Sequence, residues 1–281
     1  MSESQGIERR FELEWMDRTV HTVQYPAVSS TRGTVLILHG LGDHVGRYVW
    51  AIELFHNQGF DVLGIDWPGC GQSSGIRGDL PVLDEACRMV EEVLEALEVV
   101  PVGVLGHSTG GFFLTHFLAR SLPVFSSVKW AWFSSPLLDP SHGQSVLKIA
   151  AAKLLVKVLP KFTLSTGVYP RDCFHTGGGP RSRDFAEGVH NRISLRFGED
   201  LLDPEKVAVK VAGRIDENIS ILVTQGAADH VCAPEVAEPF VQELKIQDKA
   251  FLFVRGARHE PFREPDSFAF LNQVRAWLAR R

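Results

Sequence analysis

Three residues whose side chains could together cleave acyl bonds lie far apart in this chain: Ser108, Asp229 and His259. A serine hydroxyl is a poor nucleophile at neutral pH, so a base within hydrogen-bond reach must accept its proton during attack. An imidazole titrates near neutral pH and suits that task. A carboxylate behind the imidazole holds the correct tautomer and stabilises the imidazolium that forms. The three side chains could therefore perform nucleophilic catalysis if the fold brings them together.

The context of Ser108 indicates a nucleophile. It is the central residue of GHSTG (residues 106–110), which follows an apolar run at 102–105 and precedes a helix-like stretch at 111–121. A strand, a sharp turn and a helix are the setting that a nucleophile elbow requires. Such a turn holds its central residue in strained backbone geometry and needs small neighbours. We expect the hydroxyl to stand at the carboxyl end of a strand.

The candidate acid and base follow two further apolar segments. Asp229 comes shortly after the β-branched run at 219–224, and His259 follows the apolar run at 250–254. Both runs are typical of buried strands of a parallel sheet. Ligand sites of open α/β sheets lie at the carboxyl edge of the strands. Two other carboxylates compete for the acid role, namely Asp139 after an earlier strand and Glu260 beside the histidine.

An early loop is the candidate for stabilising the developing oxyanion. The apolar strand at 34–38 runs into the glycine-bearing segment 39–44. A carbonyl under attack develops negative charge on its oxygen, and two preorganised backbone N–H groups can stabilise that charge. We expect these groups to come from Thr109, the residue after the nucleophile, and from Leu41. The alternative for the segment 39–44 is an ordinary strand-to-helix turn.

Strands and helices alternate along the chain, which predicts an α/β fold with a mostly parallel sheet flanked by helices. The predicted strands lie near 11–15, 19–25, 34–38, 60–65, 102–105, 128–134, 219–224 and 250–254, and the predicted helices near 47–58, 83–97, 111–121, 234–244 and 266–280. The alternation stops between Ser135 and about Arg214. We therefore predict a core in two parts, 1–134 and 214–281, with an inserted cap or lid at 135–213.

The insertion contains an apolar run from Ser145 to Pro160 that carries a narrow stripe of three lysines. Its apolar arc is wider than packing against one neighbour requires. One interpretation is a lid helix that lines an acyl-chain channel and rests on an anionic lipid surface. The other is a cap helix buried against the core with its lysines in solvent. The stripe is formed by Lys148, Lys153 and Lys157, and the candidate substrate-binding residues are Val146, Ile149, Leu155 and Leu159.

Bulk composition favours a soluble enzyme without nucleic acid as its partner. The formal net charge is −5, 44% of residues are hydrophobic and 22% are charged. The polar N-terminus does not resemble a secretory signal, and no apolar run approaches the roughly 20 residues that span a bilayer. We expect a cytoplasmic location, with peripheral membrane contact through the cap as an option.

The four cysteines show no metal-ligand spacing, and no metal or other cofactor is expected. They are Cys70, Cys87, Cys173 and Cys232, and reduced thiols are the simplest interpretation. Cys70 and Cys232 are expected near the site without a catalytic role. The run Gly177–Gly179 follows His175 like an oxyanion motif, but it lacks a preceding core strand, and we interpret it as a flexible loop.

Several stretches resemble the monoacylglycerol lipase and lysophospholipase-like serine hydrolases of the α/β-hydrolase fold. They are HGLGDHVGRY from His39, GIDWPGCGQSSG from Gly64, GHSTGG from Gly106, SVLKIAAAKLLVKVLPKF from Ser145, QGAADHVC from Gln225 and GARHEPFRE from Gly256. The resemblance covers nearly the whole chain from about Arg32. It implies an inserted lid, the triad Ser108, Asp229 and His259, and oxyanion donors at Leu41 and Thr109.

The chain departs from that family at two positions. The family usually has Gly-His-Gly where this chain has Cys70 between two glycines, and the residue after the nucleophile, often Met, is Thr109. Both changes bear on substrate preference. The leading hypothesis is hydrolysis of esters of single-acyl-chain lipids, monoacylglycerol or lysophospholipid. The alternatives are a general carboxylesterase, an acyltransferase acting on a non-lipid ester, and a non-catalytic binding protein of the same fold.

Overall fold

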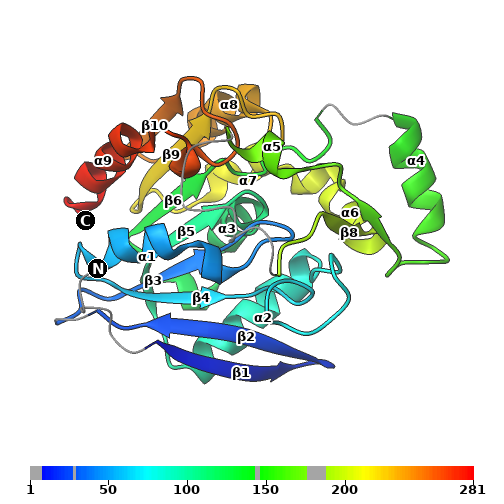
Figure 1. Cartoon of the computed structure of the whole chain (residues 1–281), viewed down its shortest axis with the longest axis horizontal. Helices are drawn as coiled ribbons and strands as arrows, with labels where there is room; N and C mark the ends of the chain where they lie inside the picture. The colour runs from blue at the N-terminus through cyan, green and yellow to red at the C-terminus, as the bar shows by residue number, and fades with distance from the viewer. Residues whose placement is uncertain (1–7, 28–29, 143–145, 176–187) are drawn as a thin grey trace.

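The computed structural model describes residues 8–27, 30–142, 146–175 and 188–281. Its main element is an eight-stranded sheet in the order β1-β2-β4-β3-β5-β6-β9-β10 (Figure 1). The strands are β1 (Arg9–Trp15), β2 (Arg18–Tyr25), β3 (Thr34–Leu38), β4 (Asp61–Ile65), β5 (Pro101–His107), β6 (Trp130–Ser134), β9 (Ser220–Gly226) and β10 (Lys249–Val254). β1 pairs antiparallel with β2, and β2 with β4, whereas all other neighbours in this sheet are parallel.

The central strands are continuous apolar runs because helices cover both of their faces. In β3, Leu36 and Leu38 pack into one core cluster, while Val35 and Ile37 pack into the other, as the two-residue period of a strand requires. The outermost strand β1 instead alternates exposed and partly buried residues, since one of its faces meets solvent. The mostly parallel sheet flanked by helices that the sequence predicts is therefore confirmed.

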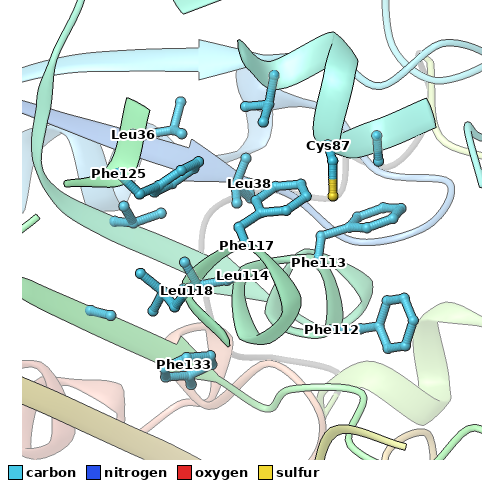
Figure 2. Packing of buried hydrophobic residues seen from close by; sticks show 14 of the residues in the cluster. Leu36, Leu38, Cys87, Phe112, Phe113, Leu114, Phe117, Leu118, Phe125 and Phe133 are labelled. Atoms are coloured by element: carbon cyan, nitrogen blue, oxygen red, sulfur yellow. The ribbon is translucent and has the colours of Figure 1, made fainter. Parts of the chain in front are cut away.

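Five helices complete the two layers around the sheet. They are α1 (Val49–His56), α2 (Leu83–Ala96), α3 (Thr109–Ala119), α8 (Ala237–Glu243) and α9 (Ser267–Leu278). Buried residues of α2, α3 and α8 belong to one cluster, and those of α1 and α9 to the other. Figure 2 shows Phe113 and Phe117 of α3 lying between that helix, Leu38 of β3 and Cys87 of α2. This packing fixes the start of α3, which carries the candidate nucleophile.

Between β6 and β9 lies the insertion, which contributes Phe197, Leu201 and Ala208 to a core cluster. Its elements are α4 (Val146–Leu155), β7 (Thr163–Ser165), α5 (Pro170–Cys173), β8 (Arg192–Ser194), α6 (Leu195–Leu201) and α7 (Ala208–Val211). β7 and β8 form a small antiparallel pair, and α4 stands at the outer end of the molecule, beyond α6 (Figure 1). The sequence predicted the break in the alternation here, but not β7, β8 or the short helices. The exact division at residues 135 and 213 stays a prediction.

Short 3-10 turns link several elements. They are η1 (Val45–Arg47), η2 (Pro123–Phe125), η4 (Pro204–Lys206), η5 (Ala212–Arg214), η6 (Pro234–Val236) and η7 (Pro261–Arg263). Two of the predicted helices are shorter than expected because such a turn replaces their first residues, η1 before α1 and η6 before α8. Among the residues that the structure describes, no helix has the length and apolar character needed to cross a bilayer.

Candidate active site

Ser108 occupies a sharp turn between β5 and α3. Its backbone has φ 53° and ψ −120°, a conformation that costs energy for a residue with a side chain. A Cβ atom added at Gly106 would lie 2.8 Å from the carbonyl oxygen of Gly110, and one added at Gly110 would lie 2.0 Å from that of Leu38. The glycines on either side of Ser108 are therefore required by close packing of α3 on β5 and β3. The predicted strand, turn and helix are confirmed.

Asp229 lies just beyond β9 and is 3% exposed. One carboxylate oxygen, Oδ1, accepts hydrogen bonds from the backbone N–H groups of Val231 at 2.7 Å and Cys232 at 3.0 Å. The other, Oδ2, accepts one from Gln225 Nε2 at 2.8 Å and lies 2.8 Å from Nδ1 of His259. Burial disfavours the charge, but His259 and these donors outweigh it and lower the pKa of Asp229. The residue is an ionised carboxylate with both oxygens engaged.

His259 lies beyond β10 and is buried, with its Nδ1 on Asp229. A carboxylate can only accept, so Nδ1 carries the proton and Nε2 keeps a free lone pair. Burial of the imidazole disfavours its charged form, but Asp229, Glu260 and Asp43 together raise the pKa of His259 above its ordinary value. Its ring lies 4.9 Å from the ring of His107, whose pKa burial lowers to about 3, so that this neighbour is neutral.

Ser108 and His259 line the same cavity, which has a volume of about 460 Å³. Leu41 and Thr109 line it as well, so the structure brings both predicted oxyanion residues to the nucleophile. Gly40 lets their loop approach, because a Cβ atom there would lie 3.0 Å from Cβ and 3.5 Å from Oγ of Ser108. Thr109 is the first residue of α3, where a backbone N–H has no acceptor within its own helix.

The insertion lines the cavity with segments that the sequence did not single out. Its lining residues are Leu137, Pro140, Thr166, Val168, Tyr169, Pro170, Cys173, Val189, His190, Asn191, Ile193 and Leu201. Of the predicted substrate-binding residues, Ile149, Leu155 and Leu159 are not among them. Leu155 and Leu159 are 43% and 49% exposed on the outer end of the molecule. Ile149 is also absent from the cavity wall, and the side chain of Val146 lies outside the description.

This difference has a physical reason. The apolar arc of the run from Ser145 to Pro160 predicted a helix in contact with the substrate, but hydrophobicity alone does not decide which apolar neighbour a helix meets. α4 ends at Leu155 and packs against α6, and the carbonyls of Pro160 and Phe162 accept hydrogen bonds from Arg196 and Leu195 at the start of α6. The cavity wall is formed instead by residues from the end of β7 through α5 and by the segment from Val189 to Ile193.

Neither competing carboxylate is in the position of the acid. Asp139 Oδ1 accepts hydrogen bonds from the backbone and the hydroxyl of Ser141, and it lines a separate small cavity. Glu260 follows His259 in the chain but receives the guanidinium of Arg47, with Nη2 lying 3.0 Å from both of its carboxylate oxygens. Of the three candidates, only Asp229 is hydrogen bonded to the imidazole of His259.

A buried charged cluster at the cavity wall is the feature that sequence reasoning missed. Arg47 Nη1 lies 2.7 Å from Asp43 Oδ1, and the same guanidinium binds Glu260. All three residues line the cavity beside Ser108. Their signal was present in the sequence, since both HGLGDHVGRY and GARHEPFRE contain charges next to the catalytic candidates. Nothing in the sequence paired one segment with the other.

The cysteines separate into different environments, and all four are buried free thiols. Cys232 Sγ lies 4.0 Å from Ser108 Oγ, and burial raises its pKa well above the ordinary value, so that it stays a neutral thiol. Cys70, at the departure from Gly-His-Gly, instead lies 3.7 Å from Nε2 of His190 in the insertion. The run Gly177–Gly179 lies outside the described residues. Within the described ranges, no group of three potential ligands could hold a metal ion.

Comparisons with known proteins identify relatives of this chain. The family model described as serine aminopeptidase S33, Hydrolase_4, matches residues 29–266. The crystal structure of Paleococcus ferrophilus monoacylglycerol lipase has a TM-score of 0.79 and 32% identity, covering 93% of this chain and 98% of that chain. Monoglyceride lipase of Mus musculus is 28% identical over 268 residues, which are 89% of this chain and 83% of the relative.

A further relative is much longer than this chain. An uncharacterized abhydrolase domain-containing protein of Dictyostelium discoideum is 26% identical over 250 residues, and the match spans 26% of its length. The family model, in contrast, spans most of the present chain, and the sheet order and serine turn agree with it. The chain therefore belongs to the Hydrolase_4 family of α/β-hydrolases and is similar to monoacylglycerol lipases.

Proposed function

We propose that this protein is a serine hydrolase that cleaves carboxylic esters of single-acyl-chain lipids through an acyl-enzyme on Ser108. The observation that carries the proposal is the 2.8 Å contact between Asp229 and His259 beside a cavity that also contains the strained serine. Oγ of Ser108 attacks the ester carbonyl while Nε2 of His259 accepts its proton. The same imidazole then returns the proton to the departing alcohol, and Asp229 stabilises the imidazolium between these steps.

The oxyanion of each tetrahedral intermediate is held by the N–H groups of Leu41 and Thr109 in this proposal. Both residues line the cavity at the nucleophile, and the start of α3 adds the positive end of a helix dipole. In the second half of the cycle a water molecule takes the place of the alcohol. His259 removes a proton from the water as its oxygen attacks the acyl carbon, and the imidazolium then returns that proton to Oγ of Ser108 as the acid leaves.

The cavity supports a substrate with one apolar tail and a polar head. Its apolar wall combines core and insertion residues, including Leu137, Val168, Ile193 and Leu201. Its charged wall is formed by Asp43, Arg47 and Glu260. A volume of about 460 Å³ lies within the range of sites for small molecules. The similarity to monoacylglycerol lipases favours an ester with a single acyl chain.

Residues 135–213 act as the cap in this proposal, and their outer surface is suited to an anionic lipid layer. Exposed apolar side chains cluster on α4 and just after it, namely Leu154, Leu155, Val158, Leu159, Phe162 and Leu164. Lys153, Lys157 and Lys161 lie in the same stretch and are exposed. Apolar side chains would enter the lipid while the ammonium groups meet its phosphates. A cytoplasmic location remains a prediction from sequence.

Vesicle sedimentation tests the cap surface. Wild-type protein should bind vesicles of phosphatidylglycerol more strongly than vesicles of phosphatidylcholine, and Val158→Asp should weaken binding to both. Its matched control is Phe253→Asp, because Phe253 is also exposed but lies on β10 in the core. Equal binding by wild type and Val158→Asp would reject contact through α4.

A chain-length series tests the substrate class. Each buried methylene contributes about 0.8 kcal/mol, so kcat/KM for p-nitrophenyl esters should rise severalfold for each one added until the cavity is full. Val168→Asp should reduce activity on long esters more than on acetate. Leu155→Asp, on the exposed helix α4, should leave monomeric substrates of every length nearly unaffected. A flat wild-type profile would favour a general esterase, and transfer of the acyl group to added alcohol in preference to water would favour an acyltransferase.

A further inference from the structure

We propose that the buried Arg47–Glu260 ion pair is a positioning element for catalysis, which holds the loop carrying Leu41 against the loop carrying His259. The inference rests on the proposed function, because it assigns these loops to the oxyanion hole and the base. The two loops belong to opposite ends of the chain, since one follows β3 and the other follows β10. β3 and β10 are not neighbours in the sheet. A direct contact between the two loops must therefore come from residues outside the strand pairing.

Arg47 and Glu260 form a buried ion pair with well-defined geometry. Nη2 of Arg47 lies 3.0 Å from both carboxylate oxygens of Glu260, and the two side chains are only 6% and 4% exposed. Arg263 adds a second cation at 3.5 Å from Glu260 Oε2. Two such charges are desolvated at considerable cost, which their pairing must offset. The two side chains should therefore stay in contact, because separating them would leave buried charges without compensation.

On the other side, Arg47 is tied to the turn that carries Leu41. Its Nη1 lies 2.7 Å from Asp43 Oδ1, and the backbone N–H of Asp43 donates to the carbonyl of Gly40 at 3.2 Å. The hydroxyl of Tyr48 donates to the second oxygen of Asp43 at 3.0 Å. Leu41 thus lies within a turn whose last residue is clamped by Arg47. The chain of contacts runs from the turn, through the guanidinium, to the residue that follows the base.

The loop of His259 has further supports from the insertion and from the core, where Phe262 stacks on Trp50 with ring centroids 4.1 Å apart. The backbone N–H of Glu260 donates to the carbonyl of Cys173 in α5 at 2.8 Å, and Arg263 lies over the ring of Phe174. The Arg47–Glu260 pair joins this loop to the β3 loop by charge, and the rings of Phe262 and Tyr48, with centroids 6.5 Å apart, form a second contact between the two loops. Removal of either partner should leave the sheet intact and alter the relative placement of Nε2 and the oxyanion donors. Misplacement by about 1 Å can cost about 100-fold in rate.

Glu260 and Arg47 carry opposite charges, so their removal should change the pKa of His259 differently. A mere loosening of the two loops would not produce this difference. The groups that face His259 are Asp229 and Cys232 beyond β9, His107 at the end of β5, Asp43 and Arg47 beyond β3, Cys173 of α5, and Glu260 beside it. The carboxylate of Glu260 contributes to raising the pKa of His259. Its loss should lower that pKa, whereas the loss of the Arg47 cation should not.

The test compares Arg47→Met with Glu260→Gln in pH profiles of kcat and kcat/KM on a soluble short-chain ester. Arg47→Met should lower the plateau kcat by about 10- to 100-fold with KM changed less than about threefold. Glu260→Gln keeps the shape of the side chain and should lower the plateau kcat less, but it should move the acid limb of the kcat/KM profile to lower pH. Arg47→Lys, which keeps the charge, should recover part of the lost kcat and covers the case in which the Met variant does not fold.

Asp79→Asn is the matched control. Asp79 is equally buried, pairs with Arg196 at 2.6 Å and Arg18 at 2.9 Å, and lies outside the cavity. This variant should lose thermal stability while its kcat and acid limb stay near wild type. If the Arg47 and Glu260 variants behave like this control, the pair is structural only and the inference is wrong. If Arg47→Met raises KM without lowering kcat, the pair binds substrate instead. Wild-type protein without any esterase activity would refute the proposed function itself.

Discussion

Replacement of Asp229 by asparagine gives the sharpest test of the proposed site, because the structure fixes what each atom of the new side chain would meet. At present Oδ1 receives two backbone N–H groups at 2.7 and 3.0 Å, and Oδ2 receives Gln225 Nε2 and His259 Nδ1, each at 2.8 Å. All four partners are donors. In Asp229→Asn, the amide NH₂ must face either the two backbone donors or the other two, and both orientations create donor conflicts.

The expected loss follows from the orientation that the variant adopts. The backbone donors cannot reorient, so the NH₂ should turn toward His259, which can respond by moving its proton to Nε2. Nε2 then has no lone pair for the hydroxyl of Ser108. Loss of the base in this way costs about 10⁴ in kcat in serine hydrolases with a triad, or about 5 kcal/mol of transition-state stabilisation. The remaining conflict with Gln225 should lower the free energy of unfolding by about 1 to 3 kcal/mol.

The assay is steady-state hydrolysis of a p-nitrophenyl ester beside a thermal melt, with Asp139→Asn as the control. Asp139 is a competing carboxylate whose side chain, within the described residues, accepts hydrogen bonds only from Ser141, so its variant should keep kcat within about twofold. A folded Asp229→Asn enzyme that retains a tenth of wild-type kcat would refute the reasoning. Loss of activity in Asp139→Asn alone would move the acid role to that residue.

Three further predictions follow from the same geometry. Ser108→Ala should lower kcat by about 10⁴ to 10⁶ and abolish labelling by a fluorophosphonate while the melting temperature is kept, and near wild-type turnover would end the serine-hydrolase proposal. The pKa of His259 is raised and catalysis needs the neutral ring, so kcat/KM should fall as the pH drops through an inflection above about 6.5. An inflection below about 6 would contradict the conclusion that the surrounding carboxylates raise this pKa. Gly40→Ala places a methyl group 3.0 Å from Cβ of Ser108 and should slow acylation by about 100-fold in a stable protein. Gly110→Ala places its methyl group 2.0 Å from a β3 carbonyl and should instead destabilise the fold. Thermal melts and single-turnover rates of both variants test this difference.

The core of the fold and the position of the triad could be predicted from the sequence because they depend on local patterns. Continuous apolar runs mark buried parallel strands, and the glycines beside Ser108 mark a turn in which a side chain would collide with β3. The chain order of the three candidates then placed Asp229 and His259 at the same edge. In each case the signal lies within a few residues of the element that it predicts.

The remainder of the site could not be predicted because it depends on contacts between distant segments. The apolar wall from Thr166 to Cys173 belongs to an irregular stretch with a four-residue helix, which has no usable period. The pairing of Arg47 with Glu260 joins loops that are adjacent only after the sheet has formed. Helix α4 was assigned to the cavity by its composition, yet its observed neighbour is α6, which lies about 40 residues further along the chain.

The sheet order has a consequence for how the protein is synthesised. β6 lies in the middle of the sheet, but its partner β9 follows only after the whole insertion, and β10 later still. A growing chain that has completed β6 therefore presents Trp130, Trp132 and Phe133 on an open edge until translation reaches β9. Such an edge invites association with other chains, and long-range parallel pairing is slow. The nascent protein thus carries its nucleophile through about half of its synthesis without a base to activate it.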